Sequence, residues 1–289
     1  MSLGNRILSF FILIVSLLPF WVLYAMSDVL FFILYYLIGY RKTVIYGNLT
    51  TAFPEKSHKE IKHIAKQFYV FLADMFVETI KMRSIRAEEV KRRITLANEE
   101  EIYRYLDQGI PIIGATAHYG NWELGIHRLS LMTDKPVLII YKPLSNKGFE
   151  KIFNQMRSRF NAQMVPMRQT LRQIVARKHT PHISMFLSDQ TPVRSEADYF
   201  VSFLGQPTLV FEGMEKIARK TGFPVVYCHI DRPKRGHYIC RFTTIAAHPS
   251  ATQEHEITLA YNKLLEDYIR AKPAWWLWSH RRWKHKPTS

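Results

Sequence analysis

The stretch best suited to chemistry is residues 111–125, PIIGATAHYGNWELG. Its apolar start predicts a short buried strand. The strand leads His118 into a turn that contains Gly120 and Asn121, and Glu123 follows where a helix is expected to begin. A histidine and a carboxylate presented together at a strand-to-helix junction are the residue types of a general base and of the group that orients it.

The spacing of His118 and Glu123 allows two interpretations. In the catalytic one, the Glu123 carboxylate binds one imidazole nitrogen and fixes the tautomer, so that the other nitrogen is free to take a proton from a hydroxyl. Amides at the start of the following helix would then stabilise an oxyanion. In the structural one, Glu123 only complements the helix dipole and His118 satisfies a local hydrogen bond.

Cationic candidates follow in the next strand and helix. Lys142 lies near the end of the apolar run VLIIYKP, and Arg157 and Arg159 lie in the segment 149–160, which is expected to be helical. Arginine suits phosphates and other anionic groups that need fixed geometry. Two arginines two positions apart on a helix do not both face one site, and the pattern does not choose between them. Solvated charge on a helix face is the alternative for each.

Asp189 and Gln190 lie at the end of another apolar strand, HISMFLSDQTP, which spans residues 182–192. An aspartate in this position orients a base, neutralises a cation or caps the next turn. The sequence pattern leaves these three roles open.

Strands and helices alternate through most of the chain, and they decide where these candidates meet. Strands are expected at 111–117, 137–143, 164–167, 182–192, 224–230 and 237–245, and helices at 56–82, 149–160, 170–178, 212–221 and 254–269. This order predicts an α/β fold with a mainly parallel sheet flanked by helices. Sites in such sheets lie beyond the carboxyl ends of the strands. His118, Lys142 and Asp189 all follow strand ends, so we expect one shared cleft.

The N-terminal segment is hydrophobic enough to attach the chain to a membrane. Residues 7–24 carry no charge and reach the lower length limit for crossing a bilayer, and a second apolar stretch runs over 29–40. One long span with an interfacial helix and a broken hydrophobic hairpin both fit. The Lys/Arg-rich sequence that follows predicts a cytoplasmic domain. We therefore expect a membrane-anchoring segment at 1–42 and the main domain at 43–289.

The charge balance points to an anionic partner. Lys and Arg number 40 against 24 for Asp and Glu, a formal net charge of +16. Because the chain has a membrane segment, anionic lipid is the expected partner, and no nucleic-acid-binding pattern is present. The aromatic and basic tail WWLWSHRRWKHKP is expected to be an interfacial anchor.

The sequence carries no metal-site motif and no disulfide framework. There is no HExxH pattern, and the two cysteines, Cys228 and Cys240, have no framework spacing. We expect them to be buried free thiols in a reducing compartment. No metal and no cofactor are predicted.

Taken in order, these segments resemble the bacterial lipid A biosynthesis acyltransferase family, which includes the lauroyl and myristoyl (late) acyltransferases. The resemblance covers nearly the whole chain. The matching pieces are AHYGNWELG, YKP, the R-x-R of MRSRF, FLSDQTP, FLGQPT, GMEKIARKTGFPVV and WWLWSHRRW.

The resemblance implies an inner-membrane enzyme whose glycerolipid-acyltransferase-like α/β domain lies on the cytoplasmic face. It makes His118 the general base and Glu123 its partner, places Arg157 or Arg159 in the site, and makes Asp189 the acid of the family's DQ segment.

Two further residues, Asn121 and Lys142, join the candidates for binding substrate. Lys142 stands where many members of the family carry Arg.

The expected reaction is acyl transfer. His118 would remove a proton from a hydroxyl of a lipid A precursor, and that oxygen would attack the thioester of acyl carrier protein or acyl-CoA. Another membrane lipid, such as an aminoacyl lipid, a lysophospholipid or a glycolipid, is the alternative acceptor. A non-catalytic, membrane-tethered basic binding protein is the remote alternative.

Overall fold

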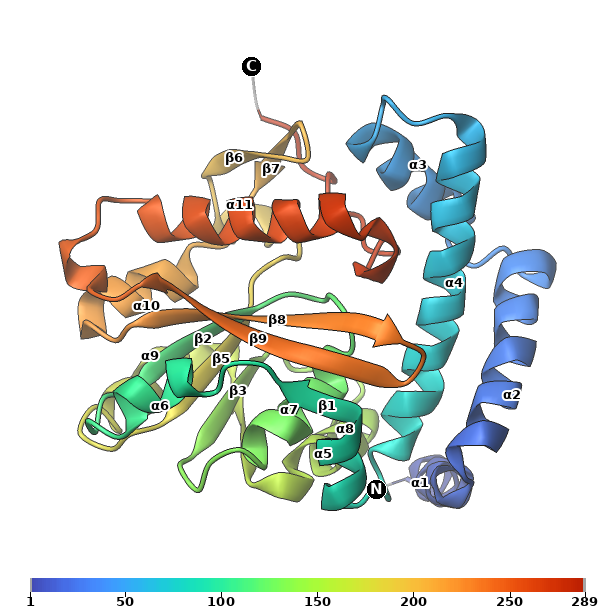
Figure 1. Ribbon diagram of the computed structural model, residues 1–289, viewed down its shortest axis with the longest axis horizontal. Helices are drawn as coiled ribbons and strands as arrows, with labels where there is room; N and C mark the ends of the chain where they lie inside the picture. Colours follow the sequence, from blue (N-terminus) through green and yellow to red (C-terminus); the bar gives the residue numbers. More distant parts are fainter. Residues whose placement is uncertain (1, 288–289) are drawn as a thin grey trace.

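A seven-stranded sheet runs through the protein, and helices cover both of its faces (Figure 1). The computed structural model describes residues 2–287. The strand order is β1-β9-β8-β2-β5-β3-β4. The strands are β1 (Ile94–Leu96), β2 (Ile112–Thr116), β3 (Val137–Tyr141), β4 (Ala162–Pro166), β5 (Ile183–Leu187), β8 (Val225–Lys234) and β9 (His237–Ala246). The sheet is parallel apart from the β8–β9 hairpin. The prediction of a mainly parallel sheet flanked by helices is confirmed.

The central strands are apolar along their whole length because both faces are covered. All five residues of β2 are buried. Ile113 and Ala115 pack into the core layer on one face, and Ile112 packs into the other. The first layer contains α4 (His58–Lys81), α9 (Thr170–Val175), α10 (Gly213–Thr221) and α11 (Glu256–Ala271), and the second contains α5 (Ala87–Arg93), α6 (Glu100–Leu106), α7 (Trp122–Ser130) and α8 (Lys147–Arg157).

Three short strands were not predicted from the sequence. β1 lies in the charged stretch between α5 and α6 and pairs on one side only, with β9. β6 (Phe200–Phe203) and β7 (Gln206–Leu209) form a separate antiparallel ribbon. Such short strands carry too few residues to show an alternating pattern. The two cysteines are buried and free, as expected, and their sulfurs lie 2.9 Å apart across β8 and β9.

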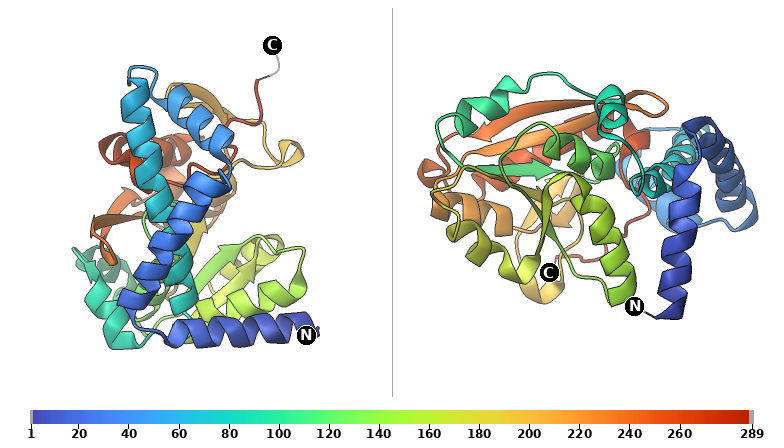
Figure 2. Two further views of the ribbon diagram at one scale, coloured as in Figure 1. Left: turned by 90° about the vertical axis from the view of Figure 1, so that its right-hand side faces the viewer. Right: turned by 90° about the horizontal axis from the view of Figure 1, so that it is seen from below.

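The N-terminal segment forms two helices rather than one continuous span over residues 7–24. α1 (Leu3–Leu17) ends just before Pro19, which is the N-cap of α2 (Phe20–Phe32). Proline has no backbone N–H and cannot continue the helix, so the chain turns sharply here (Figure 2). The Lys81 ammonium donates to the carbonyls of Ser16 and Leu18, both at 2.8 Å. A continuous span over 7–24 is therefore wrong.

One helical stretch is long and apolar enough to cross a membrane. It covers Phe20–Leu37, has a mean hydropathy of 1.7, and continues α2 through the π-helical turn η1 (Ile33–Leu37). The next helix is α3 (Lys42–Ala52). α2 packs along α4 at one edge of the domain (Figures 1 and 2). Large apolar side chains of α1, α2 and η1 stay exposed, and they are Leu3, Ile7, Phe10, Phe11, Ile14, Leu17, Trp21, Met26, Val29, Phe32, Tyr36 and Leu37.

A buried ionic cluster holds α2 and the β8–β9 hairpin against α4. The Asp74 carboxylate is fully buried and accepts hydrogen bonds from Arg232, Arg235 and the Ser27 hydroxyl. Arg235 also binds Asp28 of α2, with a distance of 2.7 Å from Nη2 to Oδ1. α4 itself begins at a capping box formed outside this cluster. The cluster therefore fixes the orientation of α2 relative to the sheet.

We predict that Asp74→Ala destabilises the protein by about 3–5 kcal/mol, because it leaves the buried Arg232 guanidinium without its counter-ion. Asp267→Ala is the matched control. It breaks an exposed pair with Lys263, so the stability should stay close to that of the wild-type protein. Denaturant unfolding of the detergent-solubilised protein measures both. Equal losses for the two variants would contradict the structural role of the cluster.

Candidate active site

Three neighbouring strands end together and bring the predicted residues to one edge of the sheet. β5 lies between β2 and β3, and all three are parallel. Thr116 of β2 is in register with Leu187 of β5. Two residues further along each strand stand His118 and Asp189, which therefore meet. Lys142 directly follows β3. The three residues lie at one edge of the sheet, but only His118 and Lys142 line the cleft there; Asp189 is buried behind His118.

The His118 imidazole is held by the Asp189 carboxylate. Nδ1 of His118 lies 2.7 Å from Oδ1 of Asp189, and the His118 amide donates to Oδ2 at 3.0 Å. The Trp276 indole N–H also donates to Oδ2, at 2.8 Å. Burial alone would raise the pKa of Asp189. The charge of His118 and the hydrogen bonds from His118 and Trp276 outweigh it and lower the pKa below its usual value. The carboxylate is therefore ionised at neutral pH.

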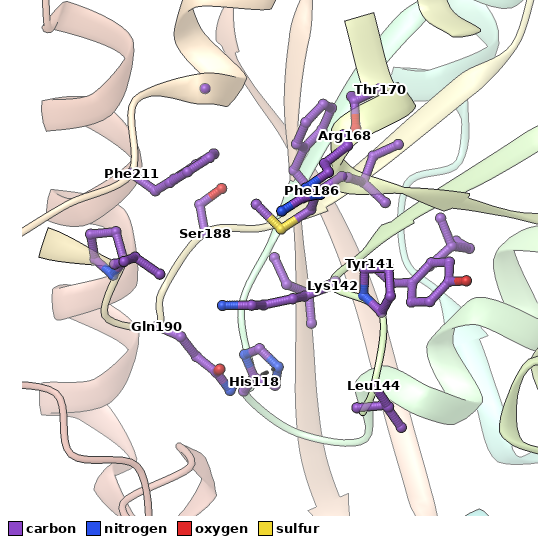
Figure 3. Close-up of a pocket in the computed structure, with 18 of the residues that line it drawn as sticks. His118, Tyr141, Lys142, Leu144, Arg168, Thr170, Phe186, Ser188, Gln190 and Phe211 are labelled. Atoms are coloured by element: carbon purple, nitrogen blue, oxygen red, sulfur yellow. Dashed lines mark hydrogen bonds between the residues drawn. The ribbon is translucent and has the colours of Figure 1, made fainter. Parts of the chain in front are cut away.

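The hydrogen-bond network assigns the His118 tautomer. An ionised carboxylate only accepts, so the proton is on Nδ1. Nε2 then carries the lone pair, and it accepts from the Gln190 amide nitrogen at 3.2 Å. His118 and Gln190 both line the adjoining cleft (Figure 3). A hydroxyl that replaces the Gln190 amide would meet a neutral nitrogen ready to take its proton.

Glu123 does not bind His118, so the pairing expected from their spacing is not formed. Its carboxylate accepts from Nε and Nη2 of Arg157, the first at 2.8 Å, and from the Trp122 indole N–H at 3.1 Å. Glu123 lies in the first turn of α7, beside the end of α8, whereas β5 delivers Asp189 directly to His118. A catalytic role for Glu123 stays a prediction, and the residue that its carboxylate binds in the cleft is Arg157.

The two arginines separate as helix geometry requires. Arg157 lines the cleft, and its guanidinium lies 4.3 Å from the centre of the Phe153 ring. Arg159 lies outside the cleft-lining residues and donates to the Met82 carbonyl. Arg157 is the last residue of α8 and Arg159 lies in the 3₁₀ turn Ser158–Phe160 that follows it, so the two side chains point in different directions. Arg157 is therefore the arginine placed to meet a substrate.

Asn121 and Lys142 lie in different surroundings. Asn121 is fully buried outside the cleft and caps α7, because its Oδ1 accepts from the Leu124 amide at 2.9 Å. Its amide nitrogen donates to the buried Glu78. This position suits a helix cap rather than a substrate ligand. Lys142 is exposed and extends into the cleft close to His118 (Figure 3).

The cleft beside His118 has a volume of about 710 Å³. Most of its wall is apolar, and its larger apolar residues include Ile126, Ile139, Phe153, Leu171, Phe186, Phe211 and Ile217. Its charged and polar groups include Lys142, Arg157 and Gln190. Lys142 and Gln190 are drawn with His118 in Figure 3. Volume and lining are those of a small-molecule site with an apolar body and a few orienting polar groups.

The tryptophan-rich tail is part of the site, and the expectation of an interfacial anchor is wrong. Trp276 and Trp278 are buried, with exposed fractions of 1% and 0%. The Leu277 amide donates to the His118 carbonyl, and the Gly120 amide donates to the Trp275 carbonyl, both at 3.0 Å. The tail therefore holds the His118 loop from behind. The density of tryptophan in WWLW was a signal for buried packing.

Gly120 is needed in this loop for two reasons. Its φ angle is +59°, and a Cβ atom there would lie 2.1 Å from the Ile230 carbonyl oxygen. Any other residue would push the loop away from β8.

Fold and site together define an α/β protein with an apolar N-terminal helix, in which a carboxylate-bound histidine faces an apolar cleft. The family model for bacterial lipid A biosynthesis acyltransferases matches residues 4–285, so the chain belongs to this family. It is similar to the lipid A biosynthesis palmitoleoyltransferase of Escherichia coli (strain K12), with 24% identity over 249 residues, 86% of this chain and 80% of that protein. The lipid A biosynthesis acyltransferase of Shigella flexneri matches with the same identity and coverage.

We predict that Asp189→Asn lowers kcat by about 10²- to 10⁴-fold while the protein stays folded. Asparagine keeps the shape, but it is neutral and does not stabilise the imidazolium or the required tautomer. Acyl transfer by the purified protein measures kcat, and circular dichroism checks the fold. Unchanged turnover would remove Asp189 from the mechanism.

We also predict that Glu123 and Arg157 act as one unit. Glu123→Gln, Arg157→Gln and the double variant should lose similar activity, since either single change breaks the same pair. The combination of Glu123→Gln with Asp189→Asn should instead be close to additive. If the losses of Glu123→Gln and Arg157→Gln add up, while Glu123→Gln costs nothing further in Asp189→Asn, Glu123 acts on His118 directly.

Proposed function

We propose that this protein transfers a fatty acyl chain from an acyl thioester to a hydroxyl of a lipid A precursor, with His118 as the general base. One observation carries the proposal. Nε2 of His118 opens on a largely apolar cleft while Asp189 holds the opposite nitrogen. Membership of the lipid A biosynthesis acyltransferase family supports the substrate class.

The first step is attack on the thioester. The acceptor hydroxyl displaces the Gln190 amide and donates its hydrogen bond to Nε2 of His118. As the oxygen attacks the thioester carbonyl, Nε2 takes the proton, and Asp189 stabilises the imidazolium that forms. A histidine held on its other nitrogen loses little freedom at this moment, which favours the transition state.

The second step is collapse of the tetrahedral intermediate. The carbonyl re-forms, the carbon–sulfur bond breaks, and the thiolate takes the proton from Nε2 of His118. Arg157 and Lys142 supply positive charge to the same cleft while negative charge sits on the carbonyl oxygen. Glu123 holds the Arg157 guanidinium through two hydrogen bonds, so little of it must reorganise during the reaction.

The remaining parts of the proposal concern the partners and the membrane. The apolar wall of the cleft accommodates the acyl chain, and the donor is acyl carrier protein or acyl-CoA. The net charge of +16 suits an acidic donor and an anionic lipid alike. The exposed apolar residues of α1 and α2 attach the protein to the inner membrane, with the catalytic domain on the cytoplasmic side.

The test is mass spectrometry of lipid A from a host that lacks its own late acyltransferases. The wild-type protein should add one acyl chain, and the added mass identifies that chain. His118→Ala should add none, because general base catalysis is worth about 10²- to 10⁴-fold in rate. His179→Ala, which removes an exposed histidine outside the cleft, is the matched control and should behave as wild type.

Three results would count against the proposal. A new acyl group on a different lipid would keep the chemistry and overturn the acceptor. Acylation by His118→Ala at the wild-type level would overturn the base. No change in any lipid, with wild-type protein present in the membrane and a thioester donor available, would overturn acyl transfer.

A further inference from the structure

A second cleft of about 900 Å³ adjoins the active-site cleft. Lys142, Thr191, Pro192 and Val193 line both clefts, so the two share a wall. Residues 191–193 directly follow Asp189 and Gln190 in the chain. The rest of the lining comes from the turn before α3 and the first turn of α3 (39–44), from Arg194 and from the C-terminal tail. It consists of Gly39, Arg41, Lys42, Thr43, Val44, Arg194, His280, Arg281, Lys284 and His285.

The second cleft carries six cations and no acid. Its Lys and Arg residues are Arg41, Lys42, Lys142, Arg194, Arg281 and Lys284, and its lining contains neither Asp nor Glu. Within residues 2–287, none of the six forms an ion pair. Like charges gathered in a hollow repel each other and attract an anion. We call this hollow the basic cleft.

His280 does not add to this charge. Burial is the main cause that lowers its pKa to about 4, so the ring is neutral at pH 7. Its Nε2 accepts a hydrogen bond from the Thr191 amide at 2.9 Å. The positive charge of the basic cleft therefore comes from its lysines and arginines.

Hydrogen bonds from α3 and its N-cap hold the basic cleft in shape. Nη1 of Arg41 donates to the Ser279 carbonyl at 2.8 Å. The Asn48 amide donates to the carbonyls of Trp278 and His280, at 2.9 and 2.7 Å. These bonds tie α3 to the tail, so the cations are brought together before any ligand binds, which reduces the entropy lost on binding.

We propose that the basic cleft binds a phosphate group on the head group of the lipid acceptor, and so places the acceptor hydroxyl at His118. This inference rests on the proposed function, because it assigns a place to the acceptor of that reaction. Clustered arginine and lysine are the residues that bind phosphate, through charge-assisted hydrogen bonds. The shared wall at Lys142 and 191–193 allows one ligand to occupy both clefts.

The position of the basic cleft favours a lipid over an acidic carrier protein. Tyr36, Leu37 and Ile38 are exposed by 54%, 68% and 66%, and the cleft begins one residue later, at Gly39. A lipid whose chains lie beside this apolar surface would bring its head group to the cations. A carrier protein needs an interface of about 800 Å² on each partner, and such an interface fits a broad face better than a hollow.

The experiment compares the double variant Arg281→Ala/Lys284→Ala with the control Lys178→Ala/Lys220→Ala. The control removes the same charge from exposed positions outside both clefts. Equilibrium binding of a phosphorylated glycolipid and of its dephosphorylated form is measured with the full-length protein in detergent micelles. Steady-state acyl transfer gives KM for acceptor and donor, and thermal unfolding checks that both variants fold.

The double variant should bind the phosphorylated lipid at least tenfold more weakly, and the dephosphorylated lipid within twofold of wild type. KM for the phosphorylated acceptor should rise by the same factor, with KM for the donor unchanged. The control should match wild type throughout. Binding is measured without turnover, so it tests the basic cleft independently of acyl transfer. If the protein prefers the phosphorylated lipid but transfers no acyl group, the role of the basic cleft is supported and only the proposed reaction is overturned.

Several results would overturn the inference. Equal loss for both lipids would mean that the cations do not recognise phosphate. A change confined to KM for a carrier-protein donor would assign the basic cleft to docking of that protein. If inorganic phosphate displaces the lipid at the same concentration at which the lipid binds, the site is one for free phosphate. Wild-type behaviour of the folded double variant would exclude any role for the basic cleft in acceptor binding.

Discussion

The contact between His118 and Asp189 is the interaction on which the site depends. It forms because β2 and β5 are adjacent, parallel and in register, so the residues just beyond their carboxyl ends meet. It is reinforced from behind by the tail, where the Trp276 indole N–H binds the same carboxylate. Strand register, tail packing and the tight turn at Gly120 therefore act on one imidazole ring.

The distribution of charge follows from how the acids are used. Asp74, Glu78, Glu123 and Asp189 are all buried and hydrogen-bonded within the protein. Burial raises the pKa of Glu78. Asp189 is also buried, but its contacts with His118 and Trp276 outweigh burial and lower its pKa, so two buried carboxyl groups differ because their contacts differ. With these acids turned inward, the excess of cations is left at the surface and in the clefts. The proposed lipid acceptor and acidic donor would both be attracted by this positive charge.

Much of the fold could be predicted from the sequence, because strand and helix signals are local. The apolar runs before His118, Lys142 and Asp189 identified three strand ends, and the rule for parallel sheets placed them at one edge. The partner of His118 could not be predicted in the same way. Glu123 is close in sequence, but Asp189 is close in space, because β5 lies beside β2. Strand order is a tertiary property that periodicity does not contain.

The tail and the N-terminal break differ in how far the sequence could predict them. Tryptophan beside arginine is typical of a membrane interface, yet here Trp276 and Trp278 fill the space behind the His118 loop. Composition does not say which surface an aromatic residue covers. The break at Pro19, in contrast, has a local cause in the missing backbone N–H, and the sequence carries that signal. The basic cleft arises from segments far apart in the chain and was not predictable.

The most direct test of the central claim is proton NMR of the His118 ring in the ¹⁵N-histidine-labelled protein. The account predicts a strongly deshielded Nδ1 proton, present in the wild-type protein and in Glu123→Gln, and lost in Asp189→Asn. Assignment by His118→Gln, which removes the signal, excludes the other histidines. A signal that survives in Asp189→Asn and disappears in Glu123→Gln would contradict the account, since it would make Glu123 the partner of the base.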